Sequence, residues 1–205
     1  MRLPRFLLNL WMSEDDAWAM TIGCFDLIVP ISYGTSRERL ARATEAIARQ
    51  AATIKSIYSQ AELVFCNCEY TFPGAEDVEW KYKQAVFEEY GYRLTARCAG
   101  KMNNSVQEAQ VIAKYIAKHK LSAKRILVVT GEMHSRSARW IWKRVMPHSQ
   151  VTVTCVNDKL EWEPNHPVLV QRTAWKWFLA NIARQILLQI FGLDRIGKLR
   201  HRANV

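Results

Sequence analysis

The chain has 205 residues, of which 49% are hydrophobic, and it carries a formal net charge of +10. Because domains average ~150 residues, this length predicts one domain with extensions. No apolar run approaches the ~18 to 20 residues that would span a bilayer, which disfavours direct membrane insertion.

We expect residues 1–24 to form a lead-in to an α/β domain over residues 25–167. Short apolar runs in this domain alternate with segments whose apolar residues recur at helical spacing. The expected strands lie at residues 25–31, 61–66, 92–98, 126–130 and 151–156, and the expected helices at about residues 36–58, 76–90, 105–120 and 138–145. Because apolar strands without alternation are covered on both faces, we predict a doubly wound, mainly parallel five-stranded sheet between helical layers, a Rossmann-like fold.

A C-terminal extension over residues 168–205 follows, with a long helix to about residue 191 and then a basic tail. The helix has a broad apolar stripe, which favours packing against the domain. Its mixture of aromatic and basic residues is also typical of peripheral contact with an anionic membrane such as the inner membrane, or with a protein partner. We therefore keep a non-catalytic adaptor as the alternative function. No recognition module for nucleic acid is visible, which disfavours that partner.

The five cysteines are an odd number, and the first eleven residues lack the cleavage pattern of a secretory signal. We therefore expect reduced thiols and a cytoplasmic protein. Cys66 and Cys68 lie two residues apart, but a metal would need two further ligands that this spacing does not supply. A buried thiol pair is the favoured interpretation.

Polar side chains follow several of the predicted strands and open the next helices. The carboxyl ends of parallel strands meet at the edge where α/β folds bind ligands, so these side chains are candidates for one site. Helix N-termini and arginines would favour an anionic group there, whereas ordinary helix capping is the alternative interpretation. The candidates are Ser32, Gly34, Thr35, Arg37, Asn67, Asn104, Ser105, Thr130, Glu132, His134 and Arg136.

His134 is the candidate for proton transfer, because an imidazole with a reference pKa of ~6.5 titrates near neutrality. If the protein is an enzyme, we expect Arg136 and the turn at residues 32–35 to hold the anion. The dinucleotide glycine pattern, the phosphate loop, the zinc-protease histidine pair and the Gly-x-Ser-x-Gly elbow are all missing, which disfavours several large enzyme classes. Whether turnover occurs stays open.

Four segments stand out together: Asp26 in the first strand, Glu79 at the start of the helix after the second strand, the segment 104–109, and Val129-Thr130 with 134–138. In these segments the chain resembles the YdcF/SanA/ElyC-like family of bacterial proteins. The resemblance implies a nucleotide-binding α/β fold, with Asp26 and Glu79 among the ligand-binding residues. It also implies a nucleotide-like small-molecule ligand, with S-adenosylmethionine a candidate, and a link to cell-envelope biogenesis. The chain departs from the family pattern at Ser105, where a threonine is usual, and at Arg136, which comes one position early.

Overall fold

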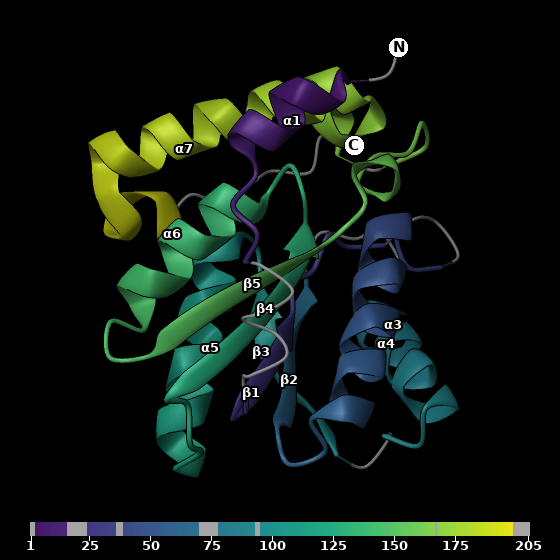
Figure 1. Cartoon of the computed structure of the whole chain (residues 1–205), viewed down its shortest axis with the longest axis vertical. Coiled ribbons are helices and arrows are strands. Elements are labelled where there is room, and N and C mark those ends of the chain that lie inside the picture. Colours follow the sequence, from purple (N-terminus) through teal and green to yellow (C-terminus); the bar gives the residue numbers. More distant parts are fainter. Residues whose placement is uncertain are drawn as a thin grey trace.

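The computed structural model describes residues 3–15, 24–35, 39–69, 78–92, 95–166 and 168–198. Its centre is a five-stranded sheet of order β3-β2-β1-β4-β5, in which every pairing is parallel (Figure 1). The strands are β1 (Leu27–Pro30), β2 (Glu62–Cys68), β3 (Ala96–Met102), β4 (Arg125–Gly131) and β5 (Gln150–Val156). The direction of winding reverses between β1 and β4, so the predicted doubly wound, Rossmann-like fold is confirmed.

Helices cover both faces of the sheet. The helices α3 and α4 pack together on one face, and α5 and α6 pack together on the other (Figure 1). A third group, α1 and α7, crosses the end of the molecule above the carboxyl ends of the strands (Figure 1). The helices are α1 (Arg5–Trp11), α3 (Arg42–Ile57), α4 (Val78–Glu89), α5 (Ser105–His119), α6 (Ser135–Val145) and α7 (Ala174–Gly197), with 3-10 turns η1 (Asp158–Leu160) and η2 (Leu169–Arg172).

The central strands are buried without alternation, as their sequence predicts. Every residue of β1 is buried, and so is every residue of β4 after Arg125. The edge strand β3 differs, because it is covered less completely and takes polar residues such as Lys101. Its bounds were therefore predicted about four residues too early. The first long helix starts at Arg42 rather than near residue 36, and an isolated antiparallel bridge joins Thr35 to Leu40 before it.

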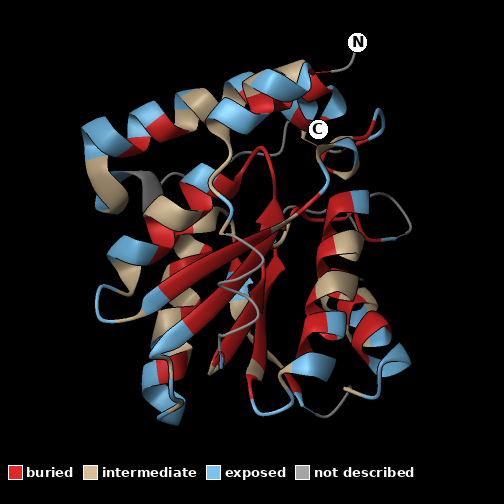
Figure 2. Cartoon of the chain, viewed as in Figure 1, coloured by how far each residue is buried: buried red, intermediate tan, exposed pale blue. Residues whose placement is uncertain are grey.

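The helix α7 has two apolar sides. Its inner side is buried, with Trp177, Phe178 and Leu188 in the core. Its outer side is exposed over most of its length (Figure 2), as is the neighbouring surface of α1. Within the described residues, no helix is both long and apolar enough to cross a membrane.

Candidate functional site

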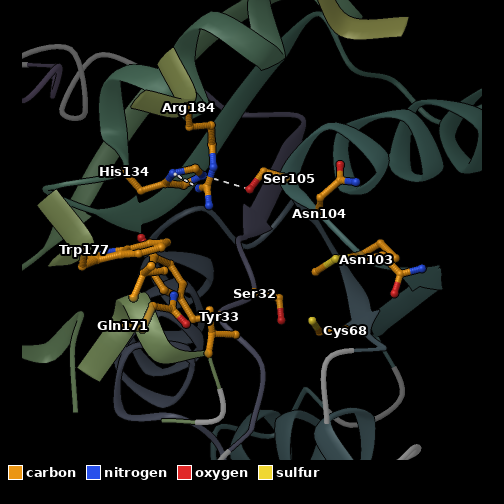
Figure 3. A pocket seen from close by; sticks show the side chains of 13 residues that line it. Ser32, Tyr33, Cys68, Asn103, Asn104, Ser105, His134, Gln171, Trp177 and Arg184 are labelled. Carbon is orange, nitrogen blue, oxygen red and sulfur yellow. Dashed lines mark hydrogen bonds between the residues drawn. The ribbon is translucent and has the colours of Figure 1, made fainter. Parts of the chain in front are cut away.

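A cavity of about 100 Å³ opens at the carboxyl edge of the sheet, where the winding direction reverses. Thirteen residues line it, and they come from the ends of three strands, the starts of two helices and the C-terminal segment (Figure 3). They are Ser32, Tyr33, Cys68, Met102, Asn103, Asn104, Ser105, His134, Val168, Val170, Gln171, Trp177 and Arg184. The cavity therefore lies where the fold class predicts a ligand.

One wall of the pocket is a chain of hydrogen bonds through His134, which is buried. Its Nε2 atom is 3.1 Å from the Ser105 hydroxyl, and its Nδ1 atom is 2.8 Å from Asn181 Oδ1. The Asn181 amide is oriented because its nitrogen donates to the Trp177 carbonyl at 2.9 Å. We assign the hydrogen to Nδ1, because the nearer partner, Asn181 Oδ1, can only accept; the Nε2 lone pair is then left to accept from Ser105.

Arg184 lies beside this chain and brings a positive charge into the pocket. Its Nη1 atom is 3.2 Å from His134 Nδ1, and its guanidinium carbon is 5.2 Å from the centre of the Trp177 ring. Burial, together with the nearby Arg184 charge, lowers the pKa of His134 to about 3. The imidazole is thus neutral at every ordinary working pH. Burial also lowers the pKa of Arg184 itself.

No carboxylate of the described residues forms an ion pair with Arg184. The ion pairs of the described chain lie elsewhere, and of the described residues that line the pocket Arg184 alone carries a formal charge at neutral pH. Its neighbours on α7 and in the pocket wall, Asn181 and His134, are both neutral. The pocket therefore contains a cation without a counter-ion from the described chain.

The opposite wall rests on a buried charged pair. The Ser32 hydroxyl donates to Glu79, whose second oxygen accepts the Cys68 amide, and Lys83 Nζ lies 3.1 Å from Glu79. Both members of this pair are fully buried. Burial lowers the pKa of Lys83, but the neighbouring acids Glu79 and Glu108 outweigh it and raise the pKa overall. Glu79 thus positions the Ser32 turn from behind the pocket.

Glu108 belongs to the same buried group and faces the Ser32 turn from α5. Its Oε1 atom accepts the Ser32 amide at 3.0 Å. Burial raises the pKa of Glu108 to about 8, so the neutral acid predominates at pH 7. With Glu108 neutral, the charges of Glu79 and Lys83 cancel inside the wall.

The floor of the pocket is fixed by Glu161, which follows η1. Its carboxyl group accepts the Met133 amide at 2.6 Å, the Tyr33 hydroxyl at 3.0 Å and the Trp177 indole at 3.3 Å. Burial raises the pKa of Glu161 to about 8. The Gly131 amide donates to the Tyr33 hydroxyl at 3.2 Å, so the end of β4 is joined to the same group. This network sets the positions of the two aromatic rings beside His134.

The structure brings some of the predicted site residues to the pocket. Ser32, Asn104, Ser105 and His134 line it. Other predicted residues are buried nearby but do not line it, namely Gly34, Thr35, Thr130 and Glu79. Gly34 has a φ of 82° and places its carbonyl to accept the Thr44 hydroxyl at 2.9 Å, so it shapes the turn.

Other predicted residues lie away from the pocket. Asp26 is at the opposite end of β1, where it accepts the Arg125 amide at 2.8 Å. Asn67 borders a separate hollow between α4 and β3. Glu132 pairs with Arg5 at 2.6 Å and accepts the Asp158 amide. Arg37 lies outside the described residues.

Arg136 points away from the pocket, although it is only two residues from His134. Its guanidinium donates to the Leu10 and Trp11 carbonyls at 2.9 and 2.7 Å and stacks on the Trp11 ring. It therefore holds the lead-in helix α1 against α6. We predicted that Arg136 would hold the anion, but the arginine that lines the pocket is Arg184.

Sequence reasoning missed Cys68, Met102 and Asn103 at the strand ends and every lining residue from the C-terminal segment. Val168, Val170 and Gln171 line the pocket from the region of η2, and Trp177 and Arg184 line it from α7. No local pattern singles out Arg184, because the helix is apolar on both sides and its polar residues Asn181, Arg184 and Gln185 stand among apolar neighbours.

No family model matches the chain, and no significant match is found among curated proteins or solved structures. The resemblance to the YdcF/SanA/ElyC-like family therefore stays a prediction. Any statement about function must come from the geometry and charge of the pocket.

Proposed function

We propose that this protein binds a small molecule that carries a phosphate or carboxylate, and that Arg184 receives this anionic group in the pocket. The observation that carries the proposal is the cation without a counter-ion among the described residues. Arg184 is half-buried, and a charge that is partly withdrawn from water is costly unless it is paired, because the protein replaces its lost hydration poorly. A guanidinium also offers two parallel donors that match a carboxylate or phosphate.

A structural role explains the position of Arg184 less well. Stacking on Trp177 stabilises a cation by about 0.5 to 2 kcal/mol, which offsets only part of the cost of burial. The contact with His134 Nδ1 is unfavourable, because in the tautomer that donates to Asn181 this nitrogen and the guanidinium both carry hydrogen. A bound anion would relieve both costs at once.

The cavity limits which part of a ligand enters. Its volume of about 100 Å³ is smaller than the roughly 300 to 1,000 Å³ of typical ligand pockets. A phosphate or a carboxylate with a few further atoms would fit inside, and the rest of a larger molecule would lie over the rim near Asn103 and Val170. A nucleotide would enter by its phosphate, and S-adenosylmethionine by its carboxylate. Both molecules therefore stay candidates, as does the link to the cell envelope that the family resemblance implies.

The test is a thermal-shift titration with inorganic phosphate, acetate, AMP and S-adenosylmethionine. A ligand at 100 times its Kd should stabilise the folded protein by about 2.7 kcal/mol. Arg184→Met should lose at least about tenfold in affinity, yet the ligand-free variant should be as stable as the wild type or more stable, because an unpaired charge has been removed.

Lys176→Met is the matched control, because Lys176 is an exposed cation on the same helix outside the pocket. This variant should keep the full ligand response. The proposal fails if none of the four compounds stabilises the wild type, or if Arg184→Met responds as the wild type does.

A second candidate function, peripheral binding to an anionic membrane, is favoured by the outer side of α7. Five large apolar residues are exposed along this side, and on α1 beside it Leu10 is 75% exposed. The two helices are in contact through the Trp11 and Phe178 rings, whose centres are 5.9 Å apart. The outer residues of α7 are Leu179, Ile186, Leu187, Ile190 and Phe191.

Charge next to this apolar side suggests the kind of surface it would contact. The sequence after α7 contains Lys198, Arg200 and Arg202, and a basic segment beside an apolar helix face is attracted to anionic lipid headgroups. The apolar side chains would enter the headgroup region while the tail stays outside it. The protein would then lie on the cytoplasmic surface of the membrane, the compartment that its cysteine usage predicts.

Liposome flotation tests this second function. The wild type should float with vesicles that contain phosphatidylglycerol, and Ile190→Glu should reduce the bound fraction several-fold. Gln189→Glu introduces the same charge at an exposed neighbouring position off the apolar side, so it should change binding little. Equal flotation of the two variants would contradict the proposal. Dimerisation of the wild type that Ile190→Glu abolishes, without vesicle binding, would assign this side to a second copy of the chain.

A further inference from the structure

We propose that Ser105 is a nucleophile that hydrolyses carboxylic esters bearing an anionic group, with His134 as its general base and Asn181 as the residue that positions the base. The proposal deepens the anion-binding function and rests on it only for the anionic part of the substrate. The remaining steps rest on the geometry of the three side chains.

The three side chains meet the distances that nucleophilic catalysis requires. Ser105 Oγ is 3.1 Å from His134 Nε2, and His134 Nδ1 is 2.8 Å from Asn181 Oδ1. A nucleophile and its base must lie within about 2.6 to 3.2 Å, and a third group must orient the base. The third group need not be acidic, because asparagine takes this position in one class of cysteine proteases. The three residues come from α5, the start of α6 and α7, so tertiary packing alone brings them together.

Helix capping, the ordinary role of such residues, does not explain their orientation. His134 stands at the N-terminal end of α6, but its side chain forms no capping hydrogen bond there. At the start of α5, the amides of Val106 and Gln107 are capped by Asn104 and not by Ser105. The Ser105 and His134 side chains are instead turned toward each other on one side of the pocket, with Arg184 beside them (Figure 3).

The hydrogen-bond pattern sets the proton positions that the reaction needs. Asn181 accepts the hydrogen on Nδ1, so Nε2 has a free lone pair directed at the Ser105 hydroxyl. The charged group that faces the imidazole is Arg184 from α7, and the titratable group that faces it is Tyr33 after β1. Burial first, and the Arg184 charge second, weaken His134 as a base by disfavouring the imidazolium. An anion bound to Arg184 offsets that charge, so the base is strengthened when an anionic substrate is present.

The reaction proceeds in two steps that balance. Ser105 Oγ bonds to the ester carbonyl carbon, its proton passes to His134 Nε2, and the carbonyl π electrons move to the oxygen. Gln171, which lines the pocket, is the candidate donor to this oxygen. The C–O bond to the alcohol then breaks, and the alcohol takes the proton from His134. Water next attacks the acyl-Ser105, gives a proton to Nε2, and releases the carboxylic acid as Ser105 recovers its hydrogen. The net change is ester plus water to acid plus alcohol.

The test uses a neutral fluorophosphonate probe on the full-length protein, with intact mass and peptide mapping. We expect one adduct on Ser105, absent in Ser105→Ala and formed at least about 100-fold more slowly in His134→Phe, since general bases contribute 10² to 10⁴ in rate. Ser122→Ala is the matched control, because Ser122 is an exposed serine outside the pocket lining and its removal should leave the adduct unchanged.

The variant Asn181→Asp distinguishes a residue that orients the His134 imidazole from one that only stabilises the fold. The new carboxylate would lie near Arg184 and His134, offset the positive charge, and raise the pH midpoint of the labelling rate. Asn181→Leu should instead slow labelling without moving Ser105. Labelling with an unshifted pH midpoint in Asn181→Asp would contradict the positioning role.

Ester substrates test the substrate class. The wild type should cleave the p-nitrophenyl monoester of succinate faster than p-nitrophenyl acetate, and Arg184→Met should lose this preference. Absence of any adduct on the folded wild type, an adduct on Ser32, or labelling unaffected by His134→Phe would overturn the proposal. Anion-induced stabilisation without an adduct would leave the binding function standing and remove only the hydrolysis. An adduct on Ser105 without anion-induced stabilisation would remove the binding function and keep the nucleophile.

Discussion

Replacing Lys83 with methionine should lower the free energy of unfolding by about 3 to 5 kcal/mol, the usual cost of removing one partner of a buried ion pair. The side chain is fully buried, its Nζ atom is 3.1 Å from Glu79, and it donates to the Cys66 carbonyl at 3.0 Å. Methionine keeps most of the volume and the helix propensity of lysine, so the loss would report on charge. The Glu79 carboxylate would be left in the wall of the pocket without its cation. Urea denaturation at pH 7 measures the change.

Two further variants make this prediction specific. Lys81→Met changes an exposed lysine two residues earlier on the same helix and should shift the unfolding free energy by less than about 0.5 kcal/mol. Lys83→Met combined with Glu79→Gln removes both charges and should recover a large part of the stability. A double variant as unstable as Lys83→Met alone would mean that packing, and not the unpaired carboxylate, causes the loss.

Gly131→Ala should destabilise the protein by about 3 kcal/mol, at the upper end of the range for overpacked cores. A methyl group at this position would lie 2.1 Å from the Glu161 carboxyl carbon and 2.4 Å from its Cγ. Glu161 cannot simply move aside, because its carboxyl group accepts hydrogen bonds from Met133, Tyr33 and Trp177. Thermal and urea denaturation should both report the loss, and ligand-induced stabilisation should weaken with it because the same network positions the pocket.

A double-mutant cycle identifies the cause of this loss. Glu161→Ala removes the atoms that the new methyl group would meet, although it also leaves three donors without their acceptor. In the Glu161→Ala background, Gly131→Ala should therefore cost far less than it does in the wild type. Additive losses would show that the side chain of Glu161 does not limit this position.

The central strands were predictable because a strand buried on both faces has an uninterrupted run of apolar residues. The run from Ile126 to Val129 is apolar without alternation, and each of its residues is fully buried. The edge strand β3 has a weaker apolar pattern, because it contains polar residues, and its predicted bounds were wrong by about four residues for that reason. The start of α5 at Ser105 was predicted correctly, although the capping residue is Asn104; the start of α3 was placed too early, because a bridge between Thr35 and Leu40 precedes it.

The candidate site was predictable only in part, because position along the chain indicates the edge of the sheet but not the direction of each side chain. Ser105 and His134 point into the pocket, whereas Arg136, two residues beyond His134, points to α1. Arg184 could not be assigned from the sequence, because α7 is apolar on both sides and nothing local tells which side packs on the domain. The pocket is completed by a segment some fifty residues from His134, a contact that only the tertiary structure provides.

In the two functions proposed above, the helix α7 would take part in both binding events. Its inner side carries Arg184 into the pocket, and its outer side presents Ile190 to the surroundings. A ligand bound to Arg184 would stabilise the packing of α7 on the domain. If the ligand changes the affinity of the protein for vesicles by some factor, vesicles must change its affinity for the ligand by the same factor. If the bilayer binds α7 while the helix stays packed on the domain, the affinity for the ligand rises. If the bilayer pulls the helix away from the domain, the affinity for the ligand falls. A positive coupling would mean that α7 stays over the pocket when the membrane binds it, and a negative coupling would mean that the membrane moves α7 away from the pocket.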